Sequence, residues 1–83
     1  MNTGEFKERL VDLGYGYDQE LYTGGLRIRK GLDIVAFTKT NKLGVVDTGW
    51  EATASLSNSE LRELLDLLVK YAITPVSERG EAQ

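Results

Sequence analysis

The side chains of this sequence that could do acid–base chemistry are carboxylates and cations. The 83 residues contain no histidine and no cysteine, which excludes the usual zinc ligand sets and every catalytic dyad built on imidazole or thiolate. Thirteen acids are present, but they form no pair with the spacing of a metal site or an acid–base couple. Asp47, beside Thr48, is the only candidate acid outside the expected helices. We therefore predict no catalytic residue, no metal site and no cofactor, and a protein that is not an enzyme.

The basic residues offer a second kind of chemistry, because they cluster in the middle of the chain. Residues 26–46 carry five cations against one acid, a net charge of +4, while the remainder carries five cations and twelve acids, a net charge of −7. A basic hairpin containing Arg27, Arg29 and Lys30, with Tyr22 nearby, could contact a nucleic-acid backbone and stack a base. A pI of about 4.9 disfavours general nucleic-acid binding. The alternative is that a basic sheet lies between acidic helices and the charges balance locally.

The basic residues lie on segments that predict an antiparallel meander of four strands. Gly24-Gly25 is typical of a two-residue hairpin turn. This turn would pair Leu21 with Ile28, Tyr22 with Arg27 and Glu20 with Arg29, giving a cation–π contact and an opposite-charge pair on one face.

A second turn, at Gly31-Leu32, would pair Lys30 with Asp33, and it sets the faces of the following strand. The two hairpins together predict an inward face made of Leu21, Leu26, Ile28, Val35 and Phe37. Tyr22, Ile34 and Ala36 would lie on the opposite face. A fourth strand is expected in residues 43–50. A three-residue loop before it would turn Val45 inward and a four-residue loop Val46, since a slip of one residue moves every side chain to the other face.

Two amphipathic helices flank the meander. The first is expected to begin at Asn2 or Thr3 and to end at Gly14. The second begins at a capping box formed by Ser57 and Glu60, and its predicted apolar stripe consists of Leu61, Leu64, Leu65, Leu68 and Ala72. Thr74-Pro75 should stop this helix and start a single further turn, with Val76 returning to the core and Glu78 and Arg79 near the surface.

The sequence therefore predicts one α+β domain, residues 1–79, with a frayed tail at residues 80–83. Its expected architecture is an N-terminal helix, a four-stranded antiparallel meander and a C-terminal helix, with both helices on one sheet face. Neither a signal peptide nor an apolar run of membrane-spanning length is recognisable. We accordingly expect a cytoplasmic protein that does not associate with a membrane.

The last three-fifths of the chain resembles a family of small uncharacterised proteins of phages and prophages of Gram-positive bacteria. The matching positions are Asp47, Thr48, Trp50, Tyr71, Ala72, Thr74, Pro75, Glu78 and Arg79, which include a Tyr-Ala-x-Thr-Pro-x-x-Glu-Arg helix end. The segment "LDIVAFTKTNK" is similar to a strand of the same family. Trp50 stands where that family has tyrosine, and the polar stretch at residues 53–57 is longer. The resemblance implies a phage or prophage origin, a bacterial host cell and a compact α+β fold, but no activity.

These observations favour a protein–protein interaction module without catalysis. The candidate interaction surface consists of Tyr22, Arg27, Arg29, Ile34, Ala36 and Trp50. The expected partner is a host or phage protein, and a homo-oligomer is one alternative. Nucleic-acid binding by the basic hairpin is the other, which we would recognise by a strong fall of affinity with salt.

Overall fold

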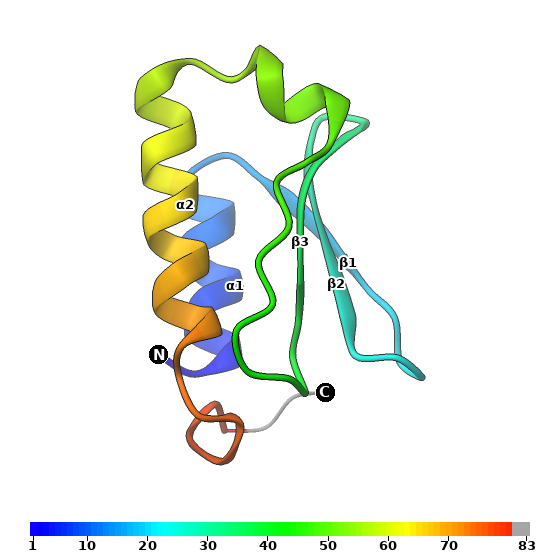
Figure 1. Cartoon of the computed structure of the whole chain (residues 1–83), viewed down its shortest axis with the longest axis vertical. Helices are drawn as coiled ribbons and strands as arrows, with labels where there is room; N and C mark the ends of the chain where they lie inside the picture. Colours follow the sequence, from blue (N-terminus) through cyan, green and yellow to red (C-terminus); the bar gives the residue numbers. More distant parts are fainter. Residues whose placement is uncertain (81–83) are drawn as a thin grey trace.

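The computed structural model describes residues 1–80 and has an α+β fold. The elements are α1 (Thr3–Asp12), β1 (Gly16–Gln19), β2 (Gly25–Lys30), β3 (Asp33–Lys39), η1 (Glu51–Ser55), α2 (Asn58–Ala72) and η2 (Val76–Glu78), where η denotes a 3₁₀ turn. Both helices lie on the same side of an antiparallel sheet with strand order β1-β2-β3, and no other element within residues 1–80 covers the second face of the sheet (Figure 1). The predicted class and the placement of the helices are confirmed, and the predicted four strands are wrong.

The fourth strand is replaced by an irregular segment beside β3. Only Asp47 pairs with this strand, through two backbone hydrogen bonds with Phe37 of 2.8 and 2.9 Å. Before that point Gly44 donates to the Ala72 carbonyl at the end of α2, so the chain is held against the helix and not along the sheet. The Thr38 hydroxyl then donates to the Val45 carbonyl. In a paired strand this carbonyl would have accepted a backbone amide instead.

The first hairpin closes in a different register from the predicted one. Gly16 pairs with Arg29 and Tyr17 with Ile28, and the connection is the five-residue segment 20–24. A turn hydrogen bond of 3.0 Å from the Gly24 amide to the Glu20 carbonyl closes this segment, with Gly24 at φ +76°. Leu21 and Tyr22 therefore lie in the turn, exposed by 82% and 101%, and the predicted pairings of Leu21, Tyr22 and Glu20 are wrong.

A β-bulge in β3 changes which side chains reach the core. The turn at residues 31–32 is as predicted, with Lys30 opposite Asp33 and Arg29 opposite Ile34, but Ile28 then faces Ala36. The extra residue, Val35, is buried, and so is Ala36. Beyond the bulge the alternation of faces is reversed, so Phe37 pairs with Arg27 on the outer face. The predictions that Phe37 faces inward and that Ala36 is on the surface are therefore wrong.

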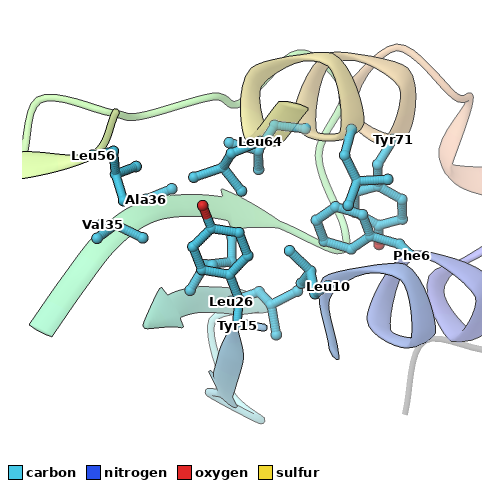
Figure 2. Packing of buried hydrophobic residues seen from close by; sticks show 12 residues of the cluster. Phe6, Leu10, Tyr15, Leu26, Val35, Ala36, Leu56, Leu64 and Tyr71 are labelled. Carbon is cyan, nitrogen blue, oxygen red and sulfur yellow. The ribbon is translucent and has the colours of Figure 1, made fainter. Parts of the chain in front are cut away.

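The core lies between the inner face of the sheet and the two helices (Figure 2). α1 is capped by Asn2, whose side chain accepts the Glu5 amide at 2.8 Å. The buried face of α2 is formed by Leu64, Leu67, Leu68, Tyr71 and Ala72, so it is rotated toward α1 relative to the predicted stripe. The rings of Phe6 and Tyr71 stack with their centroids 4.2 Å apart, which joins the two helices.

The chain after α2 forms a clamp around Arg79. The Arg79 side chain is 1% exposed, and its guanidinium donates to the carbonyls of Thr74, Lys39 and Ala72 at 2.8–3.0 Å. Its carbonyl accepts the Thr3 amide at 2.8 Å, which attaches the start of α1. The predicted stop and restart at Thr74-Pro75 are confirmed by η2, whereas Val76 is 41% exposed and Arg79 is not at the surface. Of the predicted frayed tail 80–83, residues 81–83 lie outside the described residues.

We predict that Arg79→Ala lowers the free energy of unfolding by about 3–5 kcal/mol, because it removes charge-assisted hydrogen bonds and leaves a cavity. Arg79→Lys should recover only part of this loss, since a single ammonium cannot reach three carbonyls in the planar fork of a guanidinium. Arg62→Ala, on the exposed side of α2, is the matched control. Urea unfolding measures all three. Truncation after Ile73 should lower the melting temperature as well, and an unchanged melt would contradict the clamp.

The capping box and the core of α2 generate a second prediction. The Ser57 side chain accepts the Glu60 amide and the Glu60 side chain accepts the Ser57 amide, while Leu64 and Leu68 are fully buried. Ser57→Ala should cost about 0.5–2 kcal/mol, and Leu64→Ala or Leu68→Ala about 2–5 kcal/mol. A urea series in which Ser57→Ala proved the most damaging would contradict this order.

Candidate interaction surface

The outer sheet face is the side of β1, β2 and β3 opposite the helices. It carries Asp18, Arg27, Arg29, Ile34, Phe37 and, at its edge, Lys39. The half-buried side chains among these include Arg27, Arg29, Ile34 and Phe37. Of the predicted surface residues, the structure brings Arg27, Arg29 and Ile34 together on this face.

The other predicted surface residues lie elsewhere. Tyr22 is fully exposed in the turn of residues 20–24, and Ala36 is fully buried in the core. Trp50 precedes η1 and is half-buried; its indole N–H is shielded from solvent and has no hydrogen-bond partner within residues 1–80. The predicted set is therefore not one continuous surface.

Two glycines allow the large side chains of the outer sheet face to lie flat. A Cβ atom at Gly25 would be 3.0 Å from the Phe37 ring, and one at Gly16 would be 3.1 Å from the Arg29 guanidinium. Glycine inside a strand commonly marks such a close approach. Both glycines are visible in the sequence, and Gly25 is the signal that could have placed Phe37 on this face.

The arginines of the outer sheet face are already paired. Arg27 contacts Glu20 at 3.2 Å. Arg29 contacts Asp18 through two nitrogens, at 2.5 and 3.5 Å, and also donates to the Gly31 carbonyl at 3.1 Å. Two cations and two acids balance in these pairs, which hold the arginine side chains in place. Lys39, opposite Gly25, leaves the face with a net positive charge. A phosphate would have to displace a carboxylate from each arginine.

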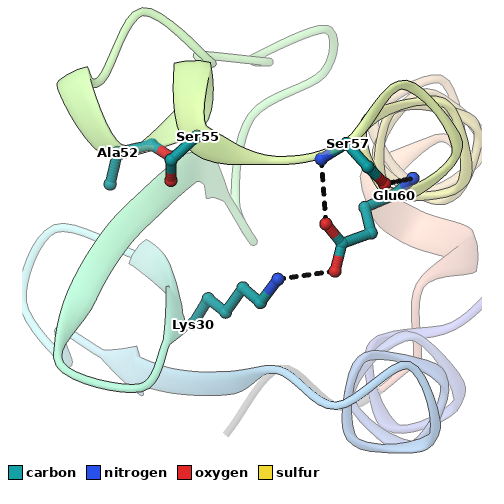
Figure 3. A network of polar contacts seen from close by, with 5 residues as sticks. All are labelled: Lys30, Ala52, Ser55, Ser57 and Glu60. Carbon is teal, nitrogen blue, oxygen red and sulfur yellow. Dashed lines mark hydrogen bonds and ion pairs between the residues drawn. The ribbon is translucent and has the colours of Figure 1, made fainter.

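Lys30, the third residue of the basic hairpin, is paired across the molecule with the cap of α2. Its ammonium contacts the Glu60 carboxylate at 2.5 Å, and the other oxygen of Glu60 accepts the Ser57 amide (Figure 3). The hydrogen bond from Lys30, followed by that from the Ser57 backbone, lowers the pKa of Glu60 from 4.5 to about 2. The same contact raises the pKa of Lys30.

Three further searches, for a metal site and a membrane-spanning helix within residues 1–80 and for similar proteins, each found nothing. No group of three acids that could hold a metal ion occurs in the part of the chain that the structure describes. Within the same residues, neither helix is long and apolar enough to cross a bilayer. Comparisons with protein-family models, with curated proteins and with solved structures give no match to this chain.

The contacts of Glu60 predict that the free energy of unfolding falls with pH over a defined acid range. Because the pKa of Glu60 is lower in the folded chain than the ordinary value of 4.5, its stabilisation is complete above pH 4.5 and is lost as the pH falls toward 2. Glu60→Gln should therefore be less stable than the parent at pH 6, and the difference should shrink as the pH falls from about 4.5 to about 2. Urea midpoints measured across this range test the prediction, and a difference independent of pH would contradict it.

Proposed function

We propose that the protein is a non-catalytic interaction module that binds another protein through its outer sheet face. The observation that supports this proposal is the arrangement of the face: Phe37 and Ile34 provide apolar area, and Arg27 and Arg29 border it in fixed conformations. Aromatic side chains and arginines are enriched at the energetic centres of interfaces. Ion pairs that form before binding reduce the side-chain entropy that binding must overcome.

The absence of histidine and cysteine from the whole sequence supports a function without catalysis. The resemblance of residues 32–81 to phage and prophage proteins supports a host or phage protein as the partner, met in the bacterial cytoplasm. Binding to nucleic acid by Arg27, Arg29 and Lys30 remains the alternative prediction. It gains no support from the contacts, since each of the three cations has a carboxylate partner.

We expect Arg27→Glu and Phe37→Ser each to reduce capture of the partner by at least tenfold, the loss typical of truncating a central interface residue. Arg62→Glu makes the same charge change on the exposed side of α2 and should have no effect. Immobilised parent and variants are compared in one host lysate with quantitative mass spectrometry, after thermal melts confirm folding. A partner bound equally by all four proteins would contradict the proposed surface. Nucleic acid in the eluate, lost steeply with salt, would favour the alternative.

A further inference from the structure

The turn between β1 and β2 projects two apolar side chains into solvent from a fixed backbone. Leu21 and Tyr22 are 82% and 101% exposed. The backbone that carries them is closed by the Gly24–Glu20 hydrogen bond, and it is anchored to the chain after β3 by a 2.8 Å bond from the Thr40 amide to the Gly24 carbonyl. We call residues 20–24 the hairpin tip; it lies at the end of the sheet opposite the β2–β3 turn and on the side away from the helices (Figure 1). A rigid projection of this kind loses little conformational entropy on binding.

The surroundings of the hairpin tip carry excess positive charge. Lys39 and Lys42 lie in the segment that bonds to the tip, together with Leu43, which is 61% exposed. Neither lysine has an ion-pair partner within residues 1–80, and the one acid of the tip, Glu20, is occupied by Arg27. The tip and this segment together present an apolar, cationic surface.

A groove with the complementary character lies between α1 and α2. Its volume is about 290 Å³, and it is lined by Arg9, Asp12, Leu13, Glu63, Asp66, Leu67 and Lys70. Leu13 and Leu67 supply the apolar part. Arg9 is paired with Glu5. The groove then holds three acids that have no ion-pair partner within residues 1–80, against the single cation Lys70. This volume is just below the range of drug-sized ligand pockets and suits one or two side chains.

We propose that the hairpin tip of one copy of this chain binds the α1–α2 groove of a second copy. Leu21 and Tyr22 would contact Leu13 and Leu67, and the lysines beside the tip would face the acids of the groove. Since the two surfaces differ, the contact is head-to-tail and repeats until it closes into a ring or continues as a filament. The contact includes neither Arg27 nor Phe37, although Arg27 pairs with Glu20 of the tip and Lys39 lies at the edge of the outer sheet face.

The charges favour a second copy over a lipid surface. Two lysines attract an anionic bilayer only weakly, and the net charge of −3 opposes that attraction. We expect a contact between one hairpin tip and one groove to bury less than the roughly 1,200–2,000 Å² of a stable interface. We therefore expect association only at high concentration, in the range of about 0.1–1 mM.

Sedimentation velocity over this concentration range is the test. The parent should form oligomers, and both Leu21→Ser/Tyr22→Ser and Glu63→Lys/Asp66→Lys should be monomeric. Leu32→Ser, a fully exposed apolar residue in the other turn, and Arg62→Glu are the controls and should associate like the parent. Melting curves check the fold of every variant.

Mixing the two monomeric variants gives the sharpest result. The tip variant keeps an intact groove and the groove variant an intact tip, so the mixture should form 1:1 dimers and nothing larger. A monomeric parent at 1 mM, a tip variant that still associates, or a mixture that stays monomeric would each overturn the proposal. So would flotation of a monomeric parent with vesicles of three parts phosphatidylcholine to one part phosphatidylserine, if the tip variant lost that binding.

Discussion

The guanidinium of Arg79 lies beneath the end of α2, where three chain segments converge. Withdrawing this charge from water costs free energy unless its donors are satisfied, and the three contacting acceptors are backbone carbonyls, not carboxylates. Two of them, Ala72 and Thr74, are at the C-terminal end of a helix, where the partial charge of the carbonyls is negative and free acceptors remain. The third, Lys39, ends β3. One side chain thus caps the helix and ties it to the sheet.

Further contacts spread from this point to the N-terminus. The Tyr71 ring lies between the Arg79 guanidinium, 4.5 Å from the ring centroid, and the Phe6 ring on its other side. Its hydroxyl shares a 2.8 Å hydrogen bond with the buried Thr3 hydroxyl. The Met1 ammonium donates to the Thr74 hydroxyl, which itself donates to the Lys70 carbonyl. The packing of α1 on α2 therefore depends on residues that follow α2 in the chain.

Structural features that depend on only a few adjacent residues could be predicted from the sequence. The capping box of Ser57 and Glu60, the turn at Gly31-Leu32 and the break at Pro75 each depend on local backbone chemistry, and all three are present. The bulge at Val35 could not be predicted, because it is fixed by what packs on both faces of β3. That single extra residue exchanged Ala36 and Phe37 between the core and the candidate surface.

The burial of Arg79 could not be predicted from the sequence for a related reason. A charged residue four positions beyond a proline, near a chain end, is typical of a solvated surface, and only the fold brings the three carbonyls together around it. The predicted register of the first hairpin was wrong because Gly24-Gly25 is also a favourable two-residue turn. The tertiary bond from Thr40 to Gly24 instead stabilises the longer connection.

The basic residues in the middle of the chain are divided by the fold into paired and unpaired ones. The basic middle of the chain suggested either contact with a nucleic-acid backbone or a local balance of charge. Arg27, Arg29 and Lys30 are each balanced by an acid from outside residues 26–46, namely Glu20, Asp18 and Glu60. Lys39 and Lys42 have no ion-pair partner within residues 1–80, and both lie beside the hairpin tip. Pairing thus neutralises the two arginines of the outer sheet face and leaves the positive charges of Lys39 and Lys42 beside the exposed Leu21 and Tyr22, a combination suited to an acidic, partly apolar groove.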